Sequence, residues 1–187
     1  MKKILLILVF VLISTGVNFA QEKTNNNKSE SKTLEFMAKG SSLIKKEFYD
    51  LGSVKGVKCQ VLIVTNLLQN SKIGCLRLET TYTGYSTSDT YIGTLDYDEI
   101  DDCITSINFI KENILISSPE VYTETEYSTR DNIEIGAFYN FNKASWSAYV
   151  YTQNYTSRSA EFFDSSSLST LVNVMIKAKE MISEKTK

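Results

Sequence analysis

The chain has 187 residues, with 20 lysines and arginines against 22 aspartates and glutamates, a net charge of -2, three cysteines and no histidine. The missing histidine excludes Ser-His-Asp and Cys-His catalysis and the zinc sites that need a histidine ligand. The slightly acidic balance lacks the lysine and arginine stripe that attracts a phosphate backbone, so no nucleic-acid partner is expected.

The first twenty residues have the pattern of a secretory signal peptide. Lys2 and Lys3 precede an apolar run over residues 4–13, which is too short to span a bilayer, and small and polar residues follow up to Ala20. We expect cleavage after Ala20, with cleavage after Gly16 as the alternative. The net charge of -2 then becomes -4, because Lys2 and Lys3 leave with the signal. The sequence predicts an exported protein, periplasmic or secreted, with no membrane span after processing.

Residues 21–33, "QEKTNNNKSESKT", show no apolar periodicity and are expected to form a flexible tether. The remaining residues, 34–187, are long enough to bury one real core. The sequence therefore predicts one domain after the signal peptide and the tether.

Eight β-rich runs alternate with turn residues, four between positions 42 and 95 and four between positions 120 and 163. Val, Ile, Thr, Tyr and Phe dominate them, with Gly, Asn and Ser between, which is typical of antiparallel strands joined by hairpins. The runs are "SLIKKEFYDL", "VKCQVLIVT", "KIGCLRLETTY", "DTYIGTL", "EVYTETEYST", "IEIGAFYNF", "ASWSAYVYT" and "RSAEFF".

The second and third runs predict their own register. If Asn66 opposes Ser71, Cys59 faces Leu78 on an apolar face, while Lys58 faces Glu79 on a polar face. Cross-strand partners share a face, so this register explains both faces at once. It also places Cys59 and Cys75 on opposite sides of the sheet.

The stretch "YIGTLDYDEIDDCITSINFIKEN" (91–113) combines a cluster of acids with an apolar stripe. Asp96 and Glu99 have the spacing of a helix N-cap and its N3 partner, and acids in the first turn complement the helix dipole. The stripe predicts an amphipathic helix with its acids turned away from the core. It consists of Ile100, Cys103, Ile104, Ile107, Ile110 and Ile114.

Two other interpretations of this cluster stay open. Asp96, Asp98 and Asp102 offer hard oxygen ligands for a calcium ion, although Asp101 and Ile107 stand where an EF-hand loop has its glycine and glutamate. The second interpretation is a catalytic pair of carboxylates. The sequence shows no apolar pocket around the acids that would make the pKa values of two carboxylates differ. The start of a helix is the favoured interpretation, and no cofactor is expected.

A second helix is predicted after Asp164, with apolar residues at the same offsets as in the first. Leu168, Val172 and Met175 correspond to Ile100, Ile104 and Ile107. Either a duplicated ββββα unit or the convergence of two amphipathic helices explains this. The predicted fold class is α+β: two runs of about four antiparallel strands, each followed by one amphipathic helix lying on a sheet.

The stretches "LDYDEID", "TETEYSTR" and "IEIGAF" resemble an uncharacterised exported bacterial protein family, over roughly residues 60–180. This resemblance implies no function. By element order alone, a doubled ββββα unit is similar to the Whirly and PUR-type nucleic-acid-binding folds, but the export signal and the acidic mature chain argue against that function.

Aromatic residues suggest a ligand-binding face in the second half. In "ASWSAYVYTQNY", Trp146, Ala148 and Val150 alternate with Ser147 and two tyrosines, so one face is apolar and the other presents hydroxyl groups. Tyrosines can hold a glycan or a peptide by stacking and hydrogen bonding. The alternative is an ordinary sheet with half-buried tyrosines. The candidate residues are Tyr149, Tyr151, Tyr139 and Tyr127.

The predicted function is a non-catalytic exported envelope or binding protein, with an envelope component, a glycan or a peptide as its partner. The alternatives are an enzyme that uses carboxylates or tyrosines from separate strands and a calcium-stabilised module. Free thiols are expected for Cys59 and Cys103, with a bridge between these two as the serious alternative.

Overall fold

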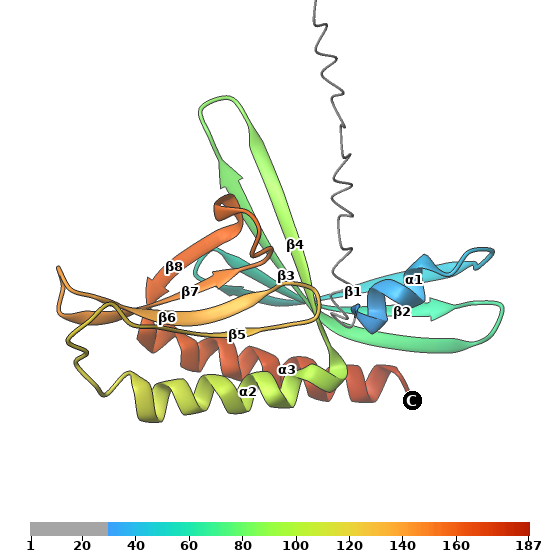
Figure 1. Cartoon of the computed structure of the whole chain (residues 1–187). Helices are drawn as coiled ribbons and strands as arrows, with labels where there is room; N and C mark the ends of the chain where they lie inside the picture. The colour runs from blue at the N-terminus through green and yellow to red at the C-terminus, as the bar shows by residue number, and fades with distance from the viewer. Residues whose placement is uncertain (1–29) are drawn as a thin grey trace, which may run out of the picture.

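Two four-stranded antiparallel sheets, each followed by a helix, make up the fold (Figure 1). The computed structural model describes residues 30–187. All eight predicted strands are present, and in each sheet they follow one another in chain order, which confirms the predicted α+β architecture. The elements are β1 (Ile44–Val54), β2 (Val57–Asn66), β3 (Ser71–Thr83), β4 (Ser88–Asp96) and α2 (Ile100–Phe109), then β5 (Glu124–Ser128), β6 (Glu134–Asn140), β7 (Ser145–Tyr151), β8 (Ala160–Asp164) and α3 (Leu168–Lys185).

Short helical turns complete the chain. A 3₁₀ turn precedes each long helix, η1 (Tyr97–Glu99) before α2 and η4 (Ser165–Ser167) before α3, and a third, η3 (Ser157–Ser159), precedes β8. A π turn, η2 (Ile110–Ile114), continues α2. The equivalent strand, 3₁₀ turn and helix at the end of both halves fit the predicted doubled ββββα unit.

The N-terminal helix α1 (Lys32–Ala38) was not predicted, and it corrects the boundary of the tether. Ser31 and Thr33, which the sequence places in the tether, are buried and hydrogen-bonded to the first sheet. Their short polar side chains give no hydrophobic signal, so their packing is invisible to a periodicity argument. The predicted signal peptide and the tether up to residue 29 lie outside the described residues.

The β2–β3 register is the predicted one. Asn66 pairs with Ser71, Cys59 with Leu78 and Lys58 with Glu79. One face carries the apolar core that meets α3. On the opposite face, α1 covers a smaller apolar cluster around Leu62, Val64 and Cys75. Both sides of the first sheet are therefore partly covered by helices.

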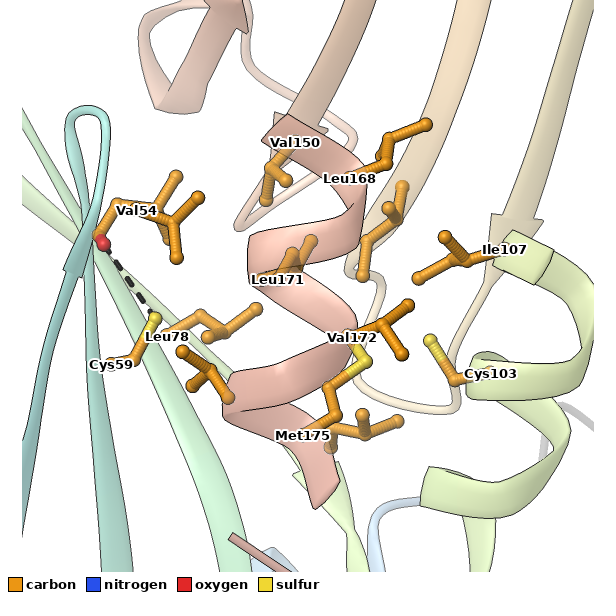
Figure 2. Packing of buried hydrophobic residues seen from close by; sticks show 14 of the residues in the cluster. Val54, Cys59, Leu78, Cys103, Ile107, Val150, Leu168, Leu171, Val172 and Met175 are labelled. Atoms are coloured by element: carbon orange, nitrogen blue, oxygen red, sulfur yellow. Dashed lines mark hydrogen bonds between the residues drawn. The ribbon is translucent and has the colours of Figure 1, made fainter. Parts of the chain in front are cut away.

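The helix of the second half covers the sheet of the first half. α3 packs across β1, β2 and β3 and also contacts α2, which itself touches β5. Figure 2 shows Leu171, Val172 and Met175 of α3 between residues of the first sheet and residues of α2. The two helices lie side by side on one side of the second sheet (Figure 1). No helix in the described part of the chain is long and apolar enough to cross a membrane.

Two glycines permit the close approach of the halves. A Cβ on Gly74 would lie 2.7 Å from the side chains of both Ile182 in α3 and Ile63 in β2. A Cβ on Gly93 would lie 2.4 Å from the carbonyl oxygen of Thr152. Both distances are shorter than real Cβ contacts, so any larger residue forces the elements apart.

All three cysteines are buried and free. Cys59 and Cys75 lie on opposite faces of the first sheet, and Figure 2 shows α3 between Cys59 and Cys103. The bridge between Cys59 and Cys103 is therefore blocked by the helix. Burial raises the pKa of Cys59 to about 11 and the pKa values of Cys75 and Cys103 to about 12, so the thiolate form is disfavoured.

We predict that the unfolded, unreduced protein takes up three equivalents of an alkylating reagent, measured by mass spectrometry. The folded protein should react slowly at pH 8, because the thiols are both buried and protonated. A single label on the unfolded chain would show that a disulfide exists and would contradict the position of α3.

Candidate functional site

Asp96, at the end of β4, is the centre of a buried polar cluster. Its side chain accepts hydrogen bonds from Ser31 Oγ at 3.0 Å, from the backbone nitrogens of Lys32 at 2.7 Å and Thr33 at 3.1 Å, and from Thr33 Oγ1 at 2.7 Å. The predicted capping box is also formed, with Asp96 N donating to Glu99 Oε2 at 3.3 Å. Asp96 thus serves the start of two helices, η1–α2 and α1.

Arg130 brings the second half of the chain to this cluster. Its guanidinium lies 3.2 Å from Asp96 Oδ2 and 3.2 Å from Glu99 Oε2, and it also pairs with Asp98. Its backbone nitrogen donates to Glu99 Oε1 at 2.9 Å. The next residue, Asp131, accepts bonds of 2.8 Å from both the backbone nitrogen and the hydroxyl of Thr94.

The turn between β5 and β6 holds Arg130 and Asp131 in position. Thr129 N donates to Ile133 O at 2.9 Å, and Asn132 takes a positive φ of 61°. Asparagine tolerates this left-handed conformation better than most residues. The sequence "TRDN" therefore forms a tight turn whose two charged residues point at the first half.

This geometry does not support the calcium hypothesis for Asp96, Asp98 and Asp102. Asp96 is 1% exposed and already surrounded by donors, whereas Asp98 pairs with Arg130 and with Lys32 at 2.7 Å. Asp102 is exposed on α2. No group of three or more potential ligands is arranged to hold a metal ion within residues 30–187. Asp96, Asp98 and Glu99 anchor α1 and Arg130, whereas Asp101 and Asp102 lie exposed on α2, away from the core as predicted.

The charges of the cluster stabilise one another. Desolvation alone would raise the pKa of Asp98, but hydrogen bonds from Arg130 and Lys32 lower it from its ordinary value of 3.8 to about 2. Desolvation likewise opposes the charge of Arg130, yet the hydrogen bond to Asp98 and the negative charges nearby raise the pKa of Arg130. The cluster is a structural ion-pair network in which Arg130 and Lys32 hold the neighbouring carboxylates.

The four candidate tyrosines do not form one surface. The register places Tyr127 and Tyr139 on the face of the second sheet that meets the helices, where Tyr139 stacks against Trp146. Tyr149 and Tyr151 lie on the opposite face. The sequence supplied the alternation within each strand but not which tyrosines of different strands share a side.

The outward side of the second sheet carries an aromatic cluster, which we call the outer aromatic face: Phe138, Tyr149, Tyr151 and Phe162. Phe162 is at its centre, with ring centroids 6.1 Å from both Phe138 and Tyr151 in edge-to-face geometry, and 6.2 Å from Tyr149. Phe162 is 56% exposed. A large aromatic side chain held by three rings and still facing solvent is an available contact surface.

Tyr149 forms the base of this face. It is 1% exposed and lies over Gly136, where a Cβ would be 2.6 Å from the tyrosine hydroxyl. The hydroxyl donates to Glu126 Oε2 at 3.3 Å. Burial first, and then Glu124 and Glu126, raise the pKa of Tyr149. It is therefore a neutral, fixed support and not a nucleophile.

A cavity of about 330 Å³ lies next to Phe162, toward the β6–β7 turn. Phe138, Ser147 and Asp164 line it together with Phe162, and Trp146 also contributes to its wall. Trp146 is the single tryptophan of the sequence. The cavity extends the outer aromatic face, and Trp146, whose ring packs against Tyr139 on the helix-facing side of the sheet, reaches its wall from β7.

A larger groove of about 630 Å³ runs between α2 and α3, over Tyr97, Ile104 and Ile176. Its central charges, Asp101 and Lys179, pair with each other. The hydrogen bond to Asp101 raises the pKa of Lys179, so this lysine stays protonated. Its central acid and lysine thus neutralise each other, and Glu180 and Lys187 add one charge of each sign to its lining.

Sequence reasoning missed Phe138, Phe162 and Arg130. The sequence held a signal for the first two. Once the hairpin registers are known, Phe138 and Phe162 fall on the same face of the second sheet as Tyr149. For Arg130 no local signal exists, since its partners lie about thirty positions upstream.

Comparisons with protein-family models, with curated proteins and with solved structures found no match. The resemblance to an exported family therefore stays a prediction.

We predict that Asp96→Ala lowers the free energy of unfolding by about 3–5 kcal/mol, because it removes one carboxylate from a buried ion-pair network and leaves the donors of Ser31, Lys32 and Thr33 without their acceptor. Asp102→Ala, on the exposed side of α2, is the control and should change it by less than about 0.5 kcal/mol. Urea titrations measure both. Equal effects would mean that the buried cluster contributes nothing to stability.

Stability should also fall as the pH drops from about 4 to about 2. Folding lowers the pKa of Asp98, so the folded protein binds this proton less readily than the unfolded chain does. The contribution of Asp98 is therefore complete above its ordinary pKa and is lost as the pH falls through the folded value. Thermal melts of Asp98→Asn should show a smaller loss over this range than the parent protein. Identical slopes would contradict the role of Asp98.

Proposed function

We propose that the protein is an exported, non-catalytic binding protein that holds its ligand on the outer aromatic face. The single observation that carries this proposal is Phe162, which three rings hold in place although it is 56% exposed. Burying such a ring costs little conformational entropy, because its position is already fixed. The ligand class that suits the face is a peptide or a glycan of the cell envelope.

Export is supported by the sequence pattern of residues 1–20. A non-catalytic role is supported by the lack of histidine in the whole sequence and by the raised pKa values of Tyr149 and Lys179. Neither group is suited to attack a substrate at neutral pH. The raised pKa values of these two groups therefore favour binding over catalysis at the surfaces where they lie.

The enzyme alternative rests on the two tyrosine–glutamate contacts of the second sheet. Tyr122 donates to Glu124 at 2.9 Å, and Tyr149 donates to Glu126 at 3.3 Å. In both tyrosines the pKa is raised, with the hydrogen bond to Glu124 as the main cause for Tyr122 and burial for Tyr149. A raised pKa suits a hydrogen-bond donor in a binding site better than a catalytic base.

We predict that Phe162→Ala weakens ligand binding about twofold to tenfold, the contribution of one aromatic contact. The mature protein, residues 21–187, is titrated with chitohexaose, hexalysine, hexaglutamate and a serine–glycine hexapeptide. Trp146 fluorescence and amide chemical shifts of β6 to β8 follow binding.

Phe109→Ala is the matched control, because Phe109 is 58% exposed on α2, on the helical side of the molecule. It should leave affinity unchanged. If none of the probes shifts the amides around Phe162, or if both variants lose binding equally, the outer aromatic face is not the binding site.

A further inference from the structure

The outer aromatic face is surrounded by carboxylates. Among the outward positions of the described strands β5 to β8 there are four acids and no lysine or arginine. Cross-strand pairing puts the acids on the side of Phe138, Tyr149 and Phe162. The four acids are Glu124, Glu126, Glu134 and Asp164.

Within residues 30–187, these four acids accept hydrogen bonds from neutral donors only. Glu124 and Glu126 accept from tyrosine hydroxyls, Glu134 accepts from Asn154 Nδ2 at 2.7 Å, and Asp164 accepts from Ser166 N at 2.8 Å. None of the four forms an ion pair within 4.0 Å in that part of the chain. Their hydrogen bonds fix the carboxylates in place without neutralising Glu124, Glu126 and Glu134. Asp164 differs, because hydrogen bonds from Ser166 first, and then the positive charge of Lys55, lower its pKa.

Several acids in the first half of the chain form ion pairs instead. Glu79 pairs with Arg77 and Lys58 on the polar side of the first sheet, Asp89 pairs with Arg158, and Asp101 pairs with Lys179. On the polar side of the first sheet, Glu79 is thus matched by cations of its own strands, whereas Glu124, Glu126 and Glu134 of the second sheet form no ion pair within residues 30–187. The second arrangement is complementary to a positive partner.

We propose that the ligand of the outer aromatic face is a basic peptide segment, whose lysine or arginine side chains lie over the aromatic rings and between the four carboxylates. This inference rests on the proposed function and names its ligand class. An aromatic ring attracts a cation through its quadrupole, and a carboxylate beside the ring adds a charge-assisted hydrogen bond. The two effects act together on this face.

The cavity beside Phe162 gives one basic side chain a specific place. Phe138 and Phe162 line it for the aliphatic stem and Asp164 lines it for the charged group, while Lys143 also lines the cavity and opposes a second cation there. The negative field also acts on the tyrosines, since burial first and then Glu124 and Glu134 raise the pKa of Tyr151. A neutral glycan would bury these carboxylates without neutralising them, and an acidic polymer would be repelled.

The test is a titration of the mature protein, residues 21–187, with hexalysine, and with chitohexaose and hexaglutamate for comparison. Hexalysine should shift the amides of β6 to β8 and change Trp146 fluorescence, and its binding should weaken as salt is raised, because exposed charges are screened. Glu124→Gln combined with Glu126→Gln should reduce the affinity about threefold to tenfold.

The matched control removes two exposed acids from the helical side, Glu112→Gln combined with Glu180→Gln, and should leave the affinity within about twofold. Equal losses in both double variants would show a diffuse charge effect and overturn the inference. If chitohexaose shifts the face and hexalysine does not, the basic-peptide inference is wrong and the proposed function stands. If none of these probes shifts the face, and the serine–glycine hexapeptide does not shift it either, both are wrong. Melting curves and amide spectra of each variant establish that it is folded.

Discussion

The position of α3 between the first sheet and α2 is the constraint on which the rest of the fold depends. Leu171 and Met175 are fully buried there, and Gly74 leaves the space that Ile182 fills. Because a helix of the second half supplies the core of the first sheet, neither half can bury its apolar surface alone. The repeated ββββα order thus shares one hydrophobic core between its two halves.

A polar cluster at the end of β4 also holds the two halves of the chain together. Arg130 of the second half meets Asp96, Asp98 and Glu99 of the first, and Asp96 also receives the N-terminus of α1. Buried charges are tolerated only when they are paired and hydrogen-bonded, and here each acid has a cation or several donors. The cluster therefore fixes how the two halves and α1 are placed relative to one another, but it has no group left for chemistry.

The sequence was sufficient for the elements that depend on local periodicity. The eight strands, the two long helices, the β2–β3 register and the opposite sides of Cys59 and Cys75 all follow from alternation and helical spacing. Long-range placement was not accessible in this way. The packing of α3 on the first sheet, the arrival of Arg130 at Asp96 and the separation of Tyr139 from Tyr149 depend on tertiary contacts that no local pattern encodes.

The difference between the two sheets determines where a ligand can bind. The first sheet has α3 on one face and α1 on part of the other, and the rest of that second face is occupied by paired charges such as Arg77 and Glu79. The second sheet packs its helices on one face only, which leaves Phe162 exposed to solvent above the buried Tyr149. An aromatic surface fixed by its own rings and edged by unpaired carboxylates is costly to keep exposed unless a partner uses it. The same topology thus gives one sheet a structural role and the other a surface suited to recognition.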